Sequence, residues 1–113
     1  MGRVFVVTGV TGFLGKVVLA ELLRRREELE LDRVLLLIRP KGPFGAEERF
    51  RREVQPSACF GRLPGDWREA VEVVSASLDR PGLGMEPAAH QALTRRATHI
   101  IHAAASVDFG LPL

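Results

Sequence analysis

The stretch V-F-V-V-T-G-V-T-G-F-L-G, from Val4 to Gly15, decides the fold of this chain. Its start, Val4 to Thr8, is a short apolar run rich in β-branched residues, which is typical of a strand buried on both faces of a parallel sheet. Glycines then mark a tight turn over residues 9–12, and apolar residues at helical spacing follow it. The stretch therefore predicts a strand, a glycine-rich turn and a helix that begins at Phe13 and ends near residue 26.

Three glycines in this stretch are spaced G-x-x-G-x-x-G, and each has its own physical role. Gly9 allows the chain to turn sharply, and Gly12 allows the backbone to approach a phosphate. Gly15 allows the helix to pack close to the sheet. Amide groups near Gly12, Phe13 and Leu14 would then face an anion at the positive end of the helix dipole. This unit predicts binding of a dinucleotide pyrophosphate; the alternative is a tight turn without a ligand.

A P-loop is the main rival interpretation, because Gly15-Lys16 resembles the end of that motif. The spacing does not fit, since five residues rather than four separate Gly9 from Gly15. Val17 also stands where a Ser or Thr would have to bind magnesium. We therefore interpret Lys16 as a solvent-exposed helix residue.

The rest of the chain continues the alternation of strands and helices. Further strands are expected over residues 34–38, 71–76 and 98–103, and further helices over residues 46–54 and 87–96. This order predicts parallel strands joined by right-handed crossovers. We expect a three-layer α/β fold of the Rossmann type, a truncated doubly wound parallel sheet with strand order 3-2-1-4.

Two basic residues follow the second predicted strand. At this position of a Rossmann fold an acidic residue binds the ribose 2′-hydroxyl of NAD, whereas an arginine accommodates the 2′-phosphate of NADP. Asp32 lies at the opposite end of the strand, and Arg39 and Lys41 follow its carboxyl end. We therefore predict NADP(H) as the cofactor; the alternative is that both basic residues are exposed loop charges.

Composition and charge exclude several other classes of function. Sixteen basic and fourteen acidic residues give a net charge of +2, too even a balance to favour nucleic acid. No segment approaches the ~20 apolar residues that a transmembrane helix needs. The single cysteine, Cys59, excludes an internal disulfide, and we expect a cytoplasmic location. No histidine has other ligand-type residues at metal-site spacing, so we predict no metal site.

Five stretches resemble the extended short-chain dehydrogenases/reductases, within them the fatty acyl-CoA reductase and thioester reductase branch with its male sterility-like NAD-binding domain. They are T-G-V-T-G-F-L-G (8–15), L-L-I-R-P-K (36–41), E-R-F (48–50), S-L-D-R-P-G-L-G-M (77–85) and I-I-H-A-A-A-S-V-D-F (100–109). The resemblance covers nearly the whole chain. It implies an NADPH-dependent oxidoreductase of lipid metabolism that reduces an acyl thioester, such as a fatty acyl-CoA, to an aldehyde or alcohol.

The resemblance also implies which residues contact the cofactor. Side chains after the first strand would line the pyrophosphate, those after the second would meet the 2′-phosphate, and three alanines after the fourth would lie beneath the adenosine and ribose. The predicted cofactor site comprises Gly9, Thr11, Gly12, Phe13, Leu14, Gly15, Arg39, Lys41, Ser77, Leu78, Ala103, Ala104 and Ala105. One departure concerns the adenine: the family has Gly-Asp-Leu after the third strand, where this chain has Ala76, Ser77 and Leu78.

A second departure concerns catalysis. The family uses a Ser or Thr after its fifth strand and a Tyr-x-x-x-Lys pair, in which the tyrosine passes a proton during hydride transfer. This chain contains no tyrosine, and its lysines are Lys16 and Lys41. The resemblance therefore implies that residues 1–113 are the N-terminal portion of an NAD(P)-binding Rossmann domain, with no catalytic residue and no activity alone.

Other readings remain open. The chain could be a non-catalytic NADP(H)-binding or sensing module, a truncated gene product, or a fragment of a sugar-nucleotide epimerase or dehydratase. The Arg39-Pro40-Lys41 and Val107-Asp108-Phe109 segments argue against the epimerase class. We also expect an open edge at the fourth strand, and hence self-association or a C-terminal partner chain that supplies the missing half.

Overall fold

The computed structural model describes residues 2–103, which contain a four-stranded sheet. Its strands are β1 (Arg3–Thr8), β2 (Leu31–Ile38), β3 (Val71–Ser75) and β4 (His99–His102). All three neighbouring pairs are parallel, and the spatial order is β3-β2-β1-β4. The predicted strand order of 3-2-1-4 is therefore confirmed.

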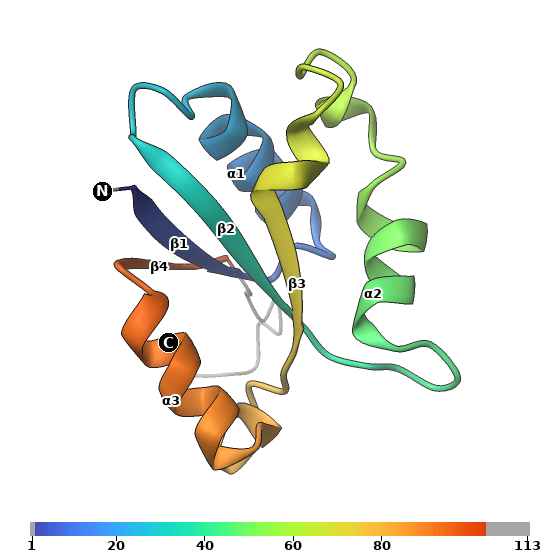
Figure 1. Ribbon diagram of the computed structural model, residues 1–113. Helices are drawn as coiled ribbons and strands as arrows, with labels where there is room; N and C mark the ends of the chain where they lie inside the picture. The colour runs from blue at the N-terminus through green and yellow to red at the C-terminus, as the bar shows by residue number, and fades with distance from the viewer. Residues whose placement is uncertain (1, 104–113) are drawn as a thin grey trace, which may run out of the picture.

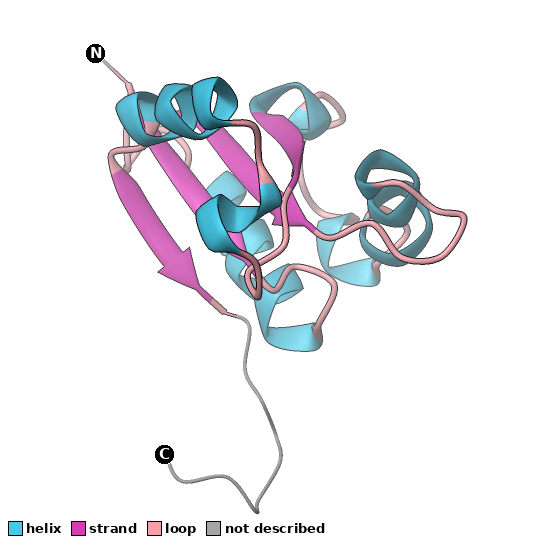
Figure 2. Ribbon diagram, turned by 90° about the horizontal axis from the view of Figure 1, so that it is seen from below, coloured by secondary structure: helices cyan, strands magenta, loops and turns pink. Residues whose placement is uncertain are grey.

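Helices cover both faces of this sheet (Figures 1 and 2). One face carries α1 (Phe13–Arg24) and α2 (Ala46–Arg49), which continues as a π-helical turn over Phe50–Val54; the other face carries α3 (Pro87–Arg96). Short 3₁₀ turns lie in the connections, at Ala58–Phe60, Trp67–Ala70 and Pro81–Gly84. The predicted three-layer arrangement is confirmed, with β4 at one edge of the sheet (Figure 2).

Each face of the sheet has its own hydrophobic core, because successive strand residues point to opposite sides. Phe5 and Val7 of β1 pack with α1 and α2, whereas Val4 and Val6 pack toward α3. Burial on both faces explains why β1 and β2 are continuously apolar rather than alternating.

An aromatic cluster closes the core beneath α2. Phe50 is fully buried, and the Trp67 ring stacks on Phe60 with their centroids 4.8 Å apart and their planes 17° from parallel. The Phe50 and Trp67 centroids are 6.3 Å apart. Such aromatic pairs add about 0.5–1.5 kcal/mol beyond the area they bury. Trp67 is therefore a packing residue that joins the chain before β3 to α2.

The strand register brings the carboxyl ends of the strands to one edge of the sheet. Thr8 pairs with Leu37 of β2 and with His102 of β4, and Ile38 pairs with Ser75 of β3. The segments that leave these ends therefore lie next to one another. In open α/β sheets this is the edge where ligands bind.

Among the strands and α1, the largest differences from the predicted boundaries are at the start of β2 and the end of α1, while the other strands differ by one residue at one or both ends. Strand β2 begins at Leu31 rather than residue 34, because Leu31 is buried and pairs with Arg3 even though the following Asp32 is exposed. Helix α1 ends at Arg24 because the chain then turns, with Leu31 donating its amide hydrogen to the carbonyl of Arg26. Glu30, at φ 52°, closes this turn.

Candidate cofactor-binding site

The glycine-rich turn has the conformation that its sequence predicts. Gly9 lies at φ 79°, a left-handed conformation that side chains disfavour, and Gly12 donates its amide hydrogen to the Gly9 carbonyl at 3.1 Å. A Cβ atom on Gly15 would lie 2.0 Å from that same carbonyl oxygen and 2.6 Å from the Cα of Val10. The contact that requires glycine at position 15 is thus between the helix and the turn itself, rather than between the helix and the sheet.

The amino end of α1 leaves backbone donors available. The carbonyl of Gly12 accepts the first helical hydrogen bond, from the amide of Lys16, and no side chain caps the helix in the part of the chain that the structure describes. The amides of the first turn, from Phe13 onward, have no carbonyl before them in the helix to pair with. A Cβ on Gly12 would meet nothing closer than the Gly9 oxygen at 3.5 Å. Backbone donors at an uncapped amino terminus suit a phosphate.

A pocket of about 330 Å³ lies beside this turn, at the carboxyl ends of β1, β2 and β3. It brings together segments that are far apart in the sequence. Its lining residues are Gly9, Val10, Thr11, Leu37, Ile38, Arg39, Arg49, Ala76, Leu78 and Asp79. This lining combines apolar and charged side chains, which suits a ring that carries polar groups.

A second, more polar hollow of about 460 Å³ adjoins this pocket at Arg39 and Asp79. Three basic side chains line it, those of Arg39, Lys41 and Arg80, and Ser77 lines it as well. Arg39 Nη1 lies 3.9 Å from the Oδ2 oxygen of Asp79, and both side chains are largely exposed. Arg39 and Lys41, which the sequence places after the carboxyl end of β2, both line this hollow, and their contact with a 2′-phosphate stays a prediction.

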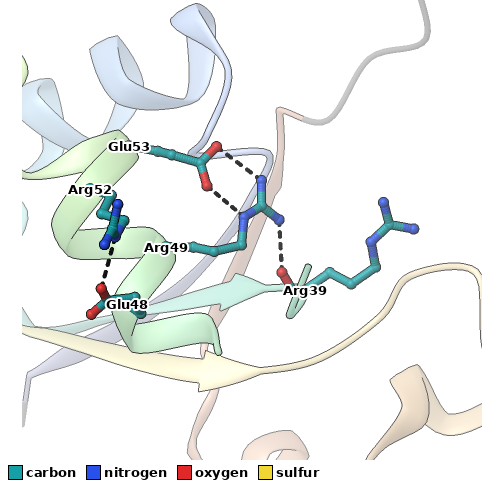
Figure 3. A network of polar contacts seen from close by, with 5 residues as sticks. All are labelled: Arg39, Glu48, Arg49, Arg52 and Glu53. Atoms are coloured by element: carbon teal, nitrogen blue, oxygen red, sulfur yellow. Dashed lines mark hydrogen bonds and ion pairs between the residues drawn. The ribbon is translucent and has the colours of Figure 1, made fainter. Parts of the chain in front are cut away.

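Arg49 of α2 holds the backbone at the end of β2 (Figure 3). Its Nη1 donates to the carbonyl oxygen of Arg39 at 2.7 Å, while Nε and Nη2 donate to the two carboxylate oxygens of Glu53 at 2.6 and 3.1 Å. The Arg49 side chain is only 11% exposed. The Arg39 side chain extends away from this network (Figure 3). Arg49 therefore fixes the main chain of Arg39 and leaves its guanidinium accessible.

The ion pair with Glu53 changes the acidity of both groups. Hydrogen bonds from Arg49 lower the pKa of the Glu53 carboxyl, and those from Glu53 raise the pKa of Arg49. On the same helical stretch, a hydrogen bond from Arg52 lowers the pKa of Glu48. The Arg49–Glu53 pair is bidentate and therefore orients the guanidinium as well as neutralising it.

The residues after β3 and β4 line the same edge. Ser77 donates its amide hydrogen to the carbonyl of Leu83 at 2.7 Å, and Leu78 lies against the first pocket with 46% of its surface exposed. Ala103 donates its amide hydrogen to the carbonyl of Thr8 at 3.1 Å. Ala104 and Ala105, also predicted to contact the cofactor, lie outside the described residues.

Three residues of this site did not stand out in the sequence. Arg49 lies within the E-R-F motif, but the motif does not indicate that the Arg49 side chain bonds to the main chain at the end of β2. Asp79 and Arg80 lie in the S-L-D-R-P-G-L-G-M stretch, which contributes to the family resemblance and predicts a loop but does not indicate a contact with Arg39. Their proximity to Arg39 depends on the parallel pairing of β2 and β3, so only the tertiary structure brings them to the site.

Two of the histidines contact other side chains of the sheet. His102 Nδ1 lies 2.7 Å from the Thr8 hydroxyl, and His99 stacks on Phe5 at a centroid distance of 4.7 Å. Cys59 is exposed. Within residues 2–103 no three His, Cys, Asp or Glu side chains gather as a metal site would require. Over the same residues, every helix is too short or too polar to cross a bilayer.

The chain matches a known protein family over most of its length. A profile of the male sterility protein family, an NAD-binding family, matches residues 7–113. Fatty acyl-CoA reductase 1 of Gallus gallus is 33% identical over 111 residues, which cover 96% of this chain and 21% of the relative. The putative fatty acyl-CoA reductase CG8303 of Drosophila melanogaster is 35% identical over 107 residues, which cover 95% of this chain and 19% of the relative.

The fold also matches solved structures. The terminal R domain from the myxalamid PKS-NRPS biosynthetic pathway superposes with a TM-score of 0.74 at 29% identity, covering 97% of this chain and 26% of that one. The chain thus spans about a fifth of the length of the two fatty acyl-CoA reductases described above.

Proposed function

This chain belongs to the male sterility protein family of NAD-binding domains, and from that premise we propose that it binds the adenosine and pyrophosphate half of NADP(H). The resemblance drawn from the motifs is thereby confirmed at the level of the family. The observation that carries the proposal is the turn from Gly9 to Gly15, whose uncapped helix start lies beside a pocket at the carboxyl edge of the sheet.

The pyrophosphate would lie on the amides at the start of α1. Gly12 leaves the approach open, and the tight contact of Gly15 with the Gly9 carbonyl fixes the direction of the helix. The positive end of the helix dipole favours the two negative charges of a pyrophosphate there. Thr11 lines the adjoining pocket, and we propose that its hydroxyl bonds to the phosphate or the ribose.

The preference for NADP(H) over NAD(H) rests on the basic residues around the second hollow. Arg39, Lys41 and Arg80 line it together, and an arginine presents paired donors that match phosphate geometry. The adenine would lie in the first pocket, between Leu78 and the backbone of Val10. Ser77, in place of the family's aspartate, lines the second hollow and would offer a neutral hydroxyl on that side of the adenosine.

The substrate of the longer protein is proposed from the relatives. Two relatives are fatty acyl-CoA reductases by name, and a solved structure with a similar fold is a reductase (R) domain of a non-ribosomal peptide synthetase. We propose that this chain serves in the reduction of an acyl thioester in lipid metabolism, in the cytoplasm, when a catalytic portion is supplied. Bound NADPH supplies the hydride for such a reduction. The chain has no tyrosine to act as proton donor, so we expect no NADPH oxidation when it alone is mixed with an acyl-CoA.

Exposed apolar side chains support the proposal of a partner. Ile100 on edge strand β4 is 71% exposed, and Phe13 and Leu14 at the start of α1 are 83% and 57% exposed. An uncovered edge strand with an exposed isoleucine favours pairing with another chain. We therefore propose self-association or a C-terminal partner chain. A non-catalytic NADP(H)-sensing module is the second candidate function, and the absence of tyrosine is the observation that favours it.

Calorimetric titration tests the proposed function. NADPH, NADH and adenosine 2′,5′-bisphosphate are titrated separately into the chain, with 5′-AMP as the ligand that lacks the 2′-phosphate. The proposal predicts saturable binding of one NADPH per chain, tighter than NADH. Absence of binding by both dinucleotides would refute it, and equal affinities would refute the role of Arg39.

A further inference from the structure

Asp79 is held at a defined place beside the candidate 2′-phosphate site. The loop after β3 is closed by backbone hydrogen bonds, from the amide of Arg80 to the carbonyl of Ser77 at 3.3 Å and from the amide of Leu83 to the carbonyl of Arg80 at 3.0 Å. Ser77 in turn donates to the carbonyl of Leu83. These bonds set the course of the loop and therefore the position of the Asp79 backbone.

The surroundings of Asp79 are basic. Its Oδ2 lies 3.9 Å from Arg39 Nη1, and the hollow that it lines also carries Lys41 and Arg80. Asp79 lines the first pocket as well, next to Leu78. It is the only acidic residue among those lining either hollow in the described part of the chain. A carboxylate therefore stands in the place where the basic side chains would receive an anion.

We propose that Asp79 is a specificity-determining residue that competes with the 2′-phosphate of NADP(H) for Arg39. This inference rests on the proposed function, since it assumes that the two hollows receive the adenosine half of a dinucleotide. The 2′-phosphate and the Asp79 carboxylate are both negative and share one guanidinium, so binding of NADP(H) requires the Arg39–Asp79 pair to open. Opening costs the energy of the pair and leaves two like charges close together.

For NAD(H), the Asp79 carboxylate should favour binding rather than oppose it. Its ribose carries a 2′-hydroxyl, which can donate a hydrogen bond to a carboxylate in the manner of the acidic residue of NAD-specific Rossmann folds. Asp79 therefore weakens the discrimination that Arg39, Lys41 and Arg80 provide. The chain is expected to prefer NADPH to NADH by a smaller factor than its three basic residues alone would give.

The test compares Asp79→Asn with the native chain. Asparagine keeps the shape of the side chain and removes its charge, so Kd for NADPH should fall by about threefold to tenfold while Kd for NADH stays the same or rises. The gain should shrink at high ionic strength, because screening weakens the pair. Asp66→Asn is the matched control: it removes one exposed negative charge at a groove that is lined by Arg24 and Leu63.

The outcomes separate this inference from the proposed function. A selective gain for NADPH in Asp79→Asn but not in Asp66→Asn supports the inference. An unchanged ratio of the two Kd values, or weaker NADPH binding by a variant with a native melting temperature, overturns it while leaving the proposed function in place. If the native chain binds neither dinucleotide, the proposed function fails and the inference fails with it.

Discussion

Arg49 donates a hydrogen bond of 2.7 Å from its Nη1 to the backbone carbonyl oxygen of Arg39, ten residues earlier in the chain. The bond ties α2 to the point where the main chain leaves β2. Glu53 holds the other side of the same guanidinium through two hydrogen bonds. Arg49 lines the first pocket but not the second hollow, and its bond thus determines where the Arg39 side chain begins.

Replacing Arg49 by glutamine tests this positioning role. The substitution removes the bond to the Arg39 carbonyl and the charge that pairs with Glu53, at a cost of about 1–2 kcal/mol in the free energy of unfolding. If Arg49 acts through Arg39, binding of NADPH should weaken by roughly fivefold, about 1 kcal/mol, while binding of NADH changes little. Urea unfolding and calorimetric titration measure the two effects.

Arg52→Gln is the matched control for that experiment. Arg52 lies on the same helical stretch and pairs with Glu48, but it makes no bond to the Arg39 carbonyl. Its replacement should leave the ratio of NADPH to NADH affinity unchanged. Equal losses for both cofactors in Arg49→Gln would instead mean that Arg49 only stabilises the fold.

Gly15→Ala should distort the glycine-rich turn. The added Cβ would lie 2.0 Å from the Gly9 oxygen and 2.6 Å from the Val10 Cα, which are backbone atoms that cannot rotate away. Overpacking of this kind costs about 1–3 kcal/mol, and binding of both dinucleotides should weaken because the turn serves the shared pyrophosphate. Gly65→Ala is the control, since its Cβ would meet no atom within 4 Å. Native stability and affinity in Gly15→Ala would contradict the described turn.

Acid should weaken the Arg49–Glu53 pair. The pKa of Glu53 is lowered from its ordinary value of 4.5, so the pair stabilises the folded chain above that value and its contribution is lost as the pH falls through the lowered pKa. The difference in unfolding free energy between the native chain and Glu53→Gln should therefore be largest near about pH 7 and shrink below 4.5. Glu69→Gln, at an exposed glutamate, is the control. A difference that stays constant across this range would argue against the pair.

The exposed edge at β4 should produce concentration-dependent association. Ile100 projects from this strand and is 71% exposed, so Ile100→Lys should shift the chain toward monomer by placing a charge on the edge. Gln91→Lys, on the exposed surface of α3, should not. Light scattering over a dilution series measures the mass; a native chain that stays monomeric at every concentration would contradict the prediction.

The sheet could be predicted from the sequence because its strands are buried on both faces. Val4–Thr8 and residues 34–38 are continuous apolar runs, and a glycine-rich turn joins the first of them to a helix. The start of β2 could not be read in the same way, because Asp32 is exposed at the end of the sheet and interrupts the apolar pattern. The end of α1 could not be located either, because no glycine follows it: the cap residue Arg25 lies at φ −97°, and the chain turns over residues 25–30 before β2.

In the candidate site too, some residues could be predicted from the sequence, whereas others depend on the tertiary structure. Local geometry determines the turn, so the need for small residues at Gly9 and Gly15 follows from spacing alone. Arg39 could be predicted as a site residue because it comes directly after the second strand. The proximity of the Arg39 and Asp79 side chains could not be predicted, because it depends on how far the loop after β3 bends toward β2. The reach of Arg49 likewise depends on the packing of α2 on the sheet.

Amide NMR of the ¹⁵N-labelled chain during a titration with NADP⁺ would show whether the dinucleotide binds at the carboxyl edge of the sheet. We expect saturable chemical-shift changes at the amides of Gly12, Phe13 and Leu14, and at Arg39, where NAD⁺ should produce smaller changes. Shifts confined to other parts of the chain, or no saturable change with either dinucleotide, would contradict the assignment of this edge as an NADP(H) site.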